Sequence, residues 1–162
     1  MTTVKVLPRV LNRLIVLVFC FSTGSPAASG GDIAVVVRGD TPVENLSLTD
    51  IRKLLMGERQ FWNGSLRVTL LMPEPGTHER EILLKKINHT NEAEFKRYWI
   101  EKIFRAEAQS GPKIAYSDQM AIELVTAIPG SIAFVESPRI PKNLKQLKID
   151  GKLPGDPDYV LK

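Results

Sequence analysis

The sequence has few of the residues that mark the commonest kinds of reactive site. Cys20 is the only cysteine among 162 residues, so no intrachain disulfide and no cysteine-based zinc or redox site can form. The two histidines are His78 and His89. A zinc-protease motif beginning at His78 would need a second histidine where Ile82 stands, and no Gly-x-Ser-x-Gly motif is present. The sequence therefore favours a protein that is not an enzyme and that needs no metal or cofactor.

A strong charge of one sign is also missing once the first residues are set aside. The formal net charge is +4, but residues 1–31 contain Lys5, Arg9 and Arg13 and no acidic residue. These are three of the 22 basic residues, which leaves 19 against 18 acidic residues in the rest of the chain. Because no basic excess remains, nucleic acid is not an expected partner.

The clearest apolar run, Leu14–Phe21, is far too short to span a bilayer. It follows the three basic residues and precedes a small, polar stretch in which Ser25-Pro26-Ala27 suits a signal peptidase. We predict a secretory signal over residues 1–28, cleaved near Ala27, and a periplasmic protein. Cys20 would leave with the signal, which suits an oxidising compartment. The alternative is an uncleaved N-terminal anchor.

In residues 29–162 short apolar runs alternate with amphipathic ones, which predicts an α/β fold with a mostly parallel sheet flanked by helices. Ile33–Val37 has no polar face and is therefore expected at the centre of the sheet. The other expected strands are Arg67–Leu71, Lys113–Tyr116 and Ser131–Val135. The expected helices run from Ser47 or Thr49 to Met56, from Thr77, from Asn91 to Gly111, and from Ser117 or Asp118 to Pro129.

Large side chains within these elements are expected to form the core. Trp62 lies in an Asn-Gly turn, and a core position is favoured for it over a ligand platform. Phe95, Trp99 and Ile103 recur every four residues, which is typical of a buried helix face. From about residue 138 the chain is rich in lysine, proline and glycine, and we expect this tail to be only partly structured.

The stretch Leu66–Leu84 reads as a buried strand, a Pro/Gly loop and a helix that begins after Thr77. Free N–H groups at such a strand-to-helix turn form the usual anion site of an α/β fold. The expected donors are the amides of Gly76, Thr77 and His78 and the Thr77 hydroxyl. For each of them the alternative is helix capping or solvation.

Two further side chains are candidates for the same anion site. Arg80 would add a positive charge, and Ser117 begins the next helix. If the strands before the two helices are parallel, both helix N-termini open at the same edge of the sheet. Here too the alternatives are solvation for Arg80 and capping for Ser117.

Four segments in order resemble periplasmic phosphate-binding proteins of ABC transporters. Val43–Trp62 is similar to their Leu-Ser, helix, Phe-x-Gly-Lys and Trp segment, and Pro75-Gly76-Thr77 with Arg80 resembles their Ser-Gly-Thr phosphate loop. Ala115–Glu136 is similar to their helix followed by Pro-Gly-Ala-Ile-Gly-Tyr-Val, and Leu147–Leu161 resembles the end of the same core segment. The resemblance implies a solute-binding protein whose two α/β lobes close on phosphate or a related oxyanion and which serves an ABC permease.

The chain departs from that family pattern in two ways. It matches one lobe with a crossing segment, and Pro75 stands where the loop serine belongs, while the arginine expected earlier falls on Leu71 or Met72. Each missing charge-assisted hydrogen bond costs about 1.5–3 kcal/mol. The alternative is a secreted interaction or sensory domain, which docks a membrane receptor or another partner, or forms a homodimer, through the surface that the missing lobe would cover.

Overall fold

A strand made almost entirely of aliphatic residues, β1 (Ile33–Arg38), lies at the centre of the sheet, as predicted. The computed structural model describes residues 31–136 and 140–162, together with Met1, so the predicted signal segment lies outside the described residues. The other strands are β2 (Asn45–Leu46), β3 (Thr69–Pro73), β4 (Lys113–Ala115), β5 (Ser131–Glu136) and β6 (Leu144–Ile149). The helices are α1 (Leu48–Leu55), α2 (His78–Ile82), the π-helical η1 (Leu83–Asn88), α3 (Glu92–Phe104) and α4 (Asp118–Ala127).

The described strands form one mixed sheet in the order β2-β6-β1-β5-β3-β4. The pairs β2·β6, β3·β5 and β3·β4 are parallel, so parallel pairing is in the majority, as expected. However, β1 runs antiparallel to both of its neighbours, β5 and β6. Strands β3 and β4 are parallel and therefore end at the same edge of the sheet.

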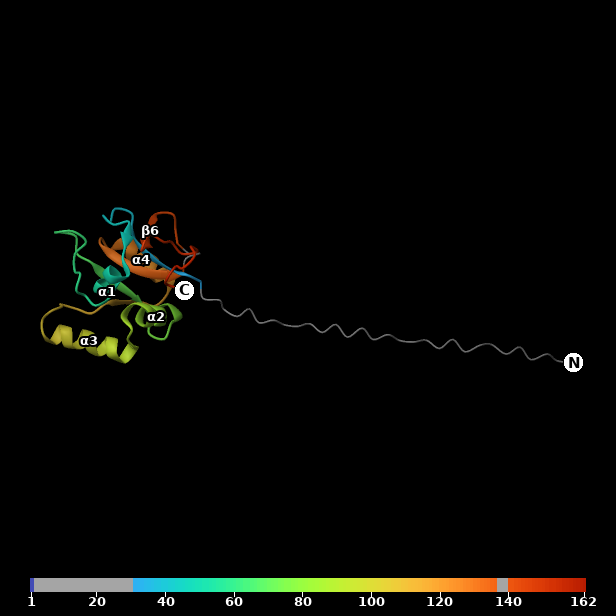
Figure 1. Cartoon of the computed structure of the whole chain (residues 1–162), viewed down its shortest axis with the longest axis horizontal. Helices are drawn as coiled ribbons and strands as arrows, with labels where there is room; N and C mark the ends of the chain where they lie inside the picture. Colours follow the sequence, from blue (N-terminus) through green and yellow to red (C-terminus); the bar gives the residue numbers. More distant parts are fainter. Residues whose placement is uncertain (2–30, 137–139) are drawn as a thin grey trace.

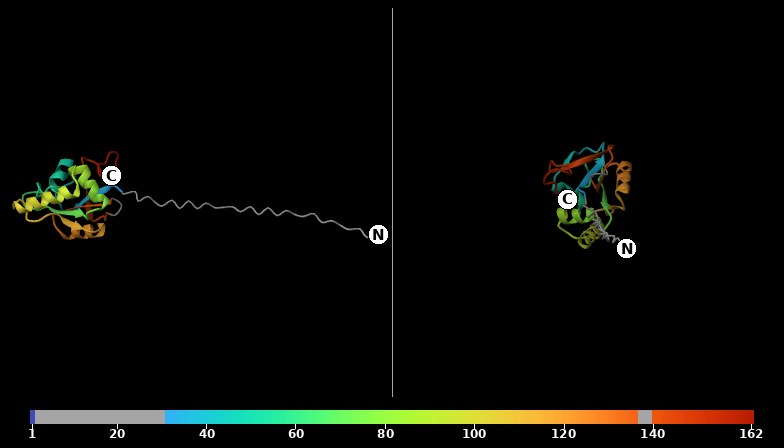
Figure 2. Two further views of the ribbon diagram at one scale, coloured as in Figure 1. Left: turned by 90° about the horizontal axis from the view of Figure 1, so that it is seen from below. Right: turned by 90° about the vertical axis from the view of Figure 1, so that its right-hand side faces the viewer.

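Helices cover both faces of the sheet, because successive strand residues point to opposite sides. Ile33, Val35 and Val37 pack in a cluster with residues of α1, η1 and α3, whereas Ala34 and Val36 pack with residues of α4. Figure 1 shows the order of the elements, and Figure 2 shows α4 on one side of the strands and the other helices on the opposite side. The result is a three-layer α/β/α arrangement.

The predicted helix starts are confirmed, because each is capped by a side chain. Ser47 and Asp50 form a reciprocal capping box on α1, and Asn91 and Glu94 form one on α3. The predicted end of α3 was wrong: the helix stops at Phe104, well before Gly111. The polypeptide turns away from the helix at Ala106, which adopts a left-handed φ of 57° at a position where glycine is the usual residue.

The predicted core is largely confirmed. Trp62, Phe95 and Trp99 are buried, and the Trp62 indole Nε1 donates to the Gly130 carbonyl oxygen at 2.8 Å. Ile103 was wrongly placed, since it is 40% exposed on the outer side of α3.

The chain beyond residue 140 contributes more structure than its composition suggests. Strand β6 lies beside the central strand β1 and pairs with it over four residues. Tyr159 and Leu161 are buried, and the Tyr159 hydroxyl donates to the Ile33 carbonyl oxygen at 2.7 Å. Burial is the main cause that raises the pKa of Tyr159 well above its usual value, and the charge of Asp32 adds to it. This tail is therefore part of the core.

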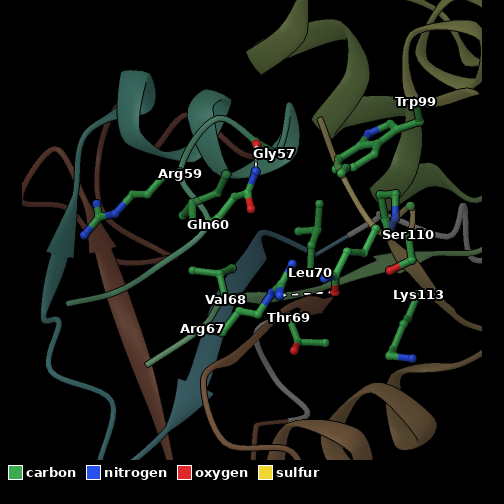
Figure 3. Close-up of a pocket in the computed structure, with 15 residues that line it drawn as sticks. Gly57, Arg59, Gln60, Arg67, Val68, Thr69, Leu70, Trp99, Ser110 and Lys113 are labelled. Carbon is green, nitrogen blue, oxygen red and sulfur yellow. Dashed lines mark hydrogen bonds between the residues drawn. The ribbon is translucent and has the colours of Figure 1, made fainter. Parts of the chain in front are cut away.

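Two cavities lie at opposite ends of β3 and β4. The carboxyl-end pocket, of about 190 Å³, is lined by residues that include Pro73 and Ala115, which end the two strands. The amino-end pocket, of about 270 Å³, is lined by residues that include Thr69 and Lys113, which begin them (Figure 3).

Candidate functional site

The turn at Gly76 and the helix start after Thr77 lie where they were predicted, but strand β3 ends two residues later than predicted. Strand β3 runs through Pro73, whereas the sequence predicted an end at Leu71. Pro73 is tolerated because it is the last residue of the strand and its carbonyl oxygen still accepts a hydrogen bond. The loop then turns at Gly76, whose φ is +88°, and α2 begins after Thr77.

Thr77 is the N-cap of α2, and its hydroxyl is fully engaged within the turn. The Thr77 Oγ1 accepts from the Arg80 amide at 3.4 Å and donates to the Glu74 carbonyl oxygen at 2.9 Å. The amides of His78 and Glu79 make no hydrogen bond to any described residue. The donors that this turn offers to a ligand are therefore backbone N–H groups, with the Thr77 hydroxyl committed elsewhere.

Ser117 occupies the matching position after β4. It is the N-cap of α4, and its Oγ accepts from the Met120 amide at 3.1 Å. Strands β3 and β4 are parallel and paired, so the two capped helix starts meet at one edge of the sheet, as the sequence analysis expected. Thr77 and Ser117 both line the carboxyl-end pocket.

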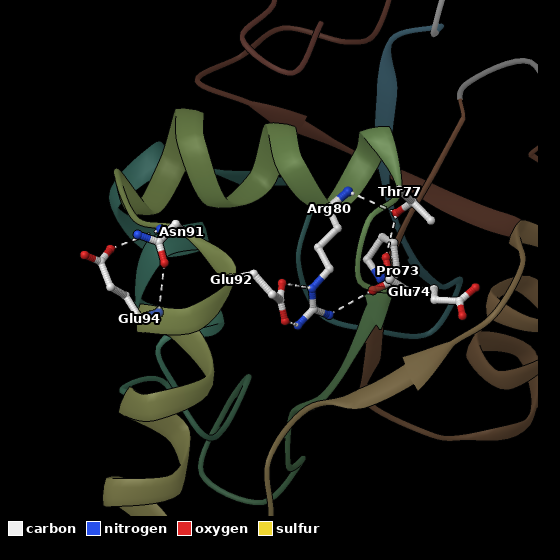
Figure 4. A network of polar contacts seen from close by, with 7 residues as sticks. All are labelled: Pro73, Glu74, Thr77, Arg80, Asn91, Glu92 and Glu94. Atoms are coloured by element: carbon white, nitrogen blue, oxygen red, sulfur yellow. Dashed lines mark hydrogen bonds and ion pairs between the residues drawn. The ribbon is translucent and has the colours of Figure 1, made fainter.

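Three of the five candidate residues do not line this pocket. Gly76 lies in the exposed loop, His78 is exposed on the first turn of α2, and Arg80 is buried at 6% exposure. The Arg80 guanidinium binds the Glu92 carboxylate through Nε at 2.6 Å and Nη2 at 2.9 Å. Its Nη1 donates to the Pro73 carbonyl oxygen at 2.8 Å, and the group lies 5.5 Å from the centre of the Phe95 ring (Figure 4).

This network gives Arg80 a structural task. It ties the last residue of β3 to the start of α3, and all of its hydrogen bonds found among the described residues are made within the protein. The guanidinium is planar and binds the carboxylate with two parallel bonds, which fixes the orientation of both groups. In this arrangement Arg80 supports the turn and does not face the carboxyl-end pocket.

The acidic character of the carboxyl-end pocket was not predicted from the sequence. Glu74, Glu79 and Asp118 line it, and no lysine, arginine or histidine among residues 31–136 and 140–162 does. Asp118 also accepts a hydrogen bond from the Glu136 amide at 3.2 Å, whereas Glu74 and Glu79 form no ion pair with a described residue. Glu79 and Asp118 occupy first helical turns, where the helix dipole favours acids. That capping signal was visible in the sequence, but its effect on the pocket was not.

Other kinds of site are not supported by the described residues. No group of three or more histidine, cysteine, aspartate or glutamate side chains is placed to hold a metal ion in the described part of the chain. His78 and His89 are both exposed. Among residues 31–136 and 140–162 no helix is long and apolar enough to cross a lipid bilayer.

Comparisons with known proteins give a result for the fold. No protein-family profile and no curated protein matches the chain. Several solved structures match the chain. An ABC-type phosphate transport receptor from Vibrio cholerae matches it with a TM-score of 0.61 and a sequence identity of 16%. The match covers 76% of this chain and 48% of the receptor. PstS from Borrelia burgdorferi matches with a TM-score of 0.60 and a sequence identity of 16%, and the match covers 76% of this chain and 49% of PstS.

A phosphate-binding protein from Stenotrophomonas maltophilia gives a TM-score of 0.55 and 15% identity, with 76% of this chain and 40% of that chain covered. The chain thus spans about half the length, or less, of the structures that it matches. These neighbours are named as binding or transport proteins, not as enzymes. The described chain has the fold of phosphate ABC transporter substrate-binding proteins, over about half of their length.

Proposed function

We propose that the chain is an exported, periplasmic solute-binding domain that recognises phosphate or a similar oxyanion and catalyses no reaction. One observation carries the proposal: the N-caps of α2 and α4, reached from parallel neighbouring strands, line the same cavity. Two helix N-termini directed at one cavity provide converging N–H donors for an anion. The fold of the neighbouring structures, whose names include phosphate binding, supports the same interpretation.

The donor set in this proposal is neutral. The Glu79 amide comes from α2, and the Ser117 hydroxyl keeps a proton to donate, because its oxygen acts as acceptor toward Met120. Gly76 allows the loop to take its left-handed turn, and nothing lies within 4 Å of the position a side chain would occupy there. Arg80 contributes by holding the turn and not by contacting the ligand.

Glu74 and Glu79, which form no ion pair with a described residue, oppose an anion in this pocket, because like charges repel across a cavity that is open to solvent. We therefore expect weak, salt-dependent binding, near millimolar, for the isolated domain. Tighter binding requires a second protein surface that excludes water from the carboxyl-end pocket.

A specific observation also favours partner docking at this edge. Tyr116 lines the carboxyl-end pocket and is 64% exposed, and exposed aromatic residues are enriched in protein interfaces. The chain spans about half the length of its structural neighbours, so a second copy, an ABC permease or a membrane receptor is a reasonable candidate to cover this surface.

Calorimetric titration of the purified protein with inorganic phosphate tests the proposal. Ser117→Ala should weaken phosphate binding about threefold to tenfold, since one neutral donor is worth about 0.5–1.5 kcal/mol. Ser110→Ala, at the amino-end pocket, is the matched control and should leave phosphate binding unchanged. Absence of heat at several millimolar phosphate would reject oxyanion binding, and light scattering after gel filtration would then test the docking alternative.

A further inference from the structure

The amino-end pocket has the opposite charge composition to the carboxyl-end pocket. Arg59, Arg67 and Lys113 line it, and none of its lining residues is acidic. The lining residues come from the loop before β3, from the α3–β4 loop, from the first residues of β3 and β4, and from α1 and α3. Figure 3 shows Gly57, Gln60 and Trp99 along one side of the cavity and Arg67 and Lys113 along the other.

Two of the three cations are available to a ligand. The Arg67 guanidinium donates through Nη1 to the Gln109 side-chain oxygen at 3.3 Å, and its Nε and Nη2 have no hydrogen-bond partner among the described residues. The Lys113 ammonium also has no ion-pair or hydrogen-bond partner in the described part of the chain. Arg59 differs, because it pairs with Asp50 at 3.4 Å and lies 5.4 Å from the centre of the Trp62 ring.

The floor of the pocket is apolar and closely packed. Leu54, Leu70 and Trp99 line it and are all buried. The Trp99 Nε1 donates to the Leu55 carbonyl oxygen at 3.2 Å, so its polar atom is already engaged. A Cβ atom at Gly57 would lie 2.5 Å from the Trp99 ring, which shows how tightly the ring is held. A ligand therefore meets a hydrocarbon surface below the cationic rim.

We propose that the amino-end pocket binds a small organic anion, in which a carboxylate or phosphate-monoester head is joined to a compact apolar body. The body lies on Leu54, Leu70 and Trp99, and the head binds Arg67 and Lys113. A volume of about 270 Å³ suits a molecule below the usual drug size. This site is separate from the proposed oxyanion edge, because the two pockets lie at opposite ends of β3 and β4 and share no lining residue. The ligands also differ, since inorganic phosphate has no apolar part to fill the floor.

Calorimetry on the full protein with benzoate, phenyl phosphate, benzyl alcohol and inorganic phosphate tests this second site. Benzoate or phenyl phosphate should bind at least tenfold more tightly than benzyl alcohol, which has a similar body and no charge. The tighter of the two anions identifies the preferred head group. Added salt should weaken their binding, because the cations are exposed to solvent.

The double variant Arg67→Gln with Lys113→Gln should weaken binding of the organic anion about tenfold or more. Both side chains are exposed, so folding should be retained, and circular dichroism checks this. Ser117→Ala is the control that leaves benzoate and phenyl phosphate unaffected, which separates this site from the oxyanion edge. Equal binding of benzyl alcohol and the anions, or unchanged binding by the double variant, would overturn the proposal.

Discussion

The two ends of β3 and β4 show that backbone geometry and side-chain charge can favour different ligands. At the carboxyl ends, two helix N-termini offer N–H donors, but the lining side chains carry three carboxylates. At the amino ends, no helix in the described part of the chain begins, and the lining side chains carry three cations. Acidic residues in the first turn of a helix stabilise it by interacting with the positive end of the helix dipole, and a bound anion would interact with the same positive end. An anion site inferred from helix N-termini must therefore be assessed together with the charges of the side chains that line it.

The largest expected effect distinguishes the glycines at the two ends. In Gly130→Ala the new Cβ would lie 2.2 Å from the Arg67 carbonyl oxygen, at a φ of +73°, so we expect a loss of at least about 3 kcal/mol of unfolding free energy. Gly76→Ala at the carboxyl end has a φ of +88° but open space, and should cost about 1–2 kcal/mol. Urea denaturation measures both. Equal losses would mean that backbone conformation alone, and not the Arg67 contact, sets the cost.

Arg80→Met tests whether this buried arginine serves stability or the ligand. Removing it leaves Glu92 and the Pro73 carbonyl oxygen without their partner, and since Glu92 is partly exposed we expect a loss of about 2–3 kcal/mol. Arg97→Met, an exposed residue of α3, should change stability by less than about 0.5 kcal/mol. A variant that loses phosphate binding while keeping its melting temperature would contradict the structural role.

The pH dependence of stability reports on the capping box of α1, whose Asp50 also pairs with Arg59 of the amino-end pocket. Hydrogen bonds from the Ser47 hydroxyl and amide hold the pKa of Asp50 below its usual value. A lowered folded pKa means that the stabilisation is present above the ordinary carboxyl pKa and is lost as the pH falls through the folded value. Asp50→Asn should therefore flatten the acid limb of the stability curve, by at most about 1 kcal/mol, because Asp50 is partly exposed. An unchanged acid limb would show that other carboxylates determine it.

Removing charge from the carboxyl-end pocket should strengthen phosphate binding. Glu74→Gln with Glu79→Gln removes two like charges, and we expect a gain of about 0.5–1 kcal/mol, or roughly twofold to fivefold in affinity, at low salt. Glu58→Gln, on an exposed residue that does not line this pocket, is the control. Calorimetry at two salt concentrations checks the result. If the double variant binds phosphate as the parent does, the carboxylates do not face the ligand.

An effect of similar size is expected in the segment that leads to the amino-end pocket. Ala106→Gly should stabilise the protein by about 0.5–1 kcal/mol, because glycine adopts the left-handed conformation without a Cβ penalty. Thermal unfolding measures the gain. Ala108→Gly, in the same loop, serves as the comparison and should give no increase.

Local signals in the sequence were enough to predict the helix starts at the candidate site. Ser47, Asn91, Thr77 and Ser117 cap through side chains within three residues, so their roles are visible in short windows. Arg80 could not be assigned in this way, because its partner Glu92 lies twelve residues away on another helix. The amino-end pocket was missed for the same reason, since its lining residues come from separate segments that only the tertiary fold brings together.

The pairing of β1 sets the order in which the domain can be completed. This strand comes first in the described chain, yet its partners β5 and β6 come last, and the Ile33 backbone is held by Leu161 and Tyr159. Contacts between such distant segments carry a large loop-closure entropy, which slows folding. The hydrophobic centre of the sheet therefore cannot close until β6 and the segment through Leu161 have been synthesised, and a nascent chain stays open until that point.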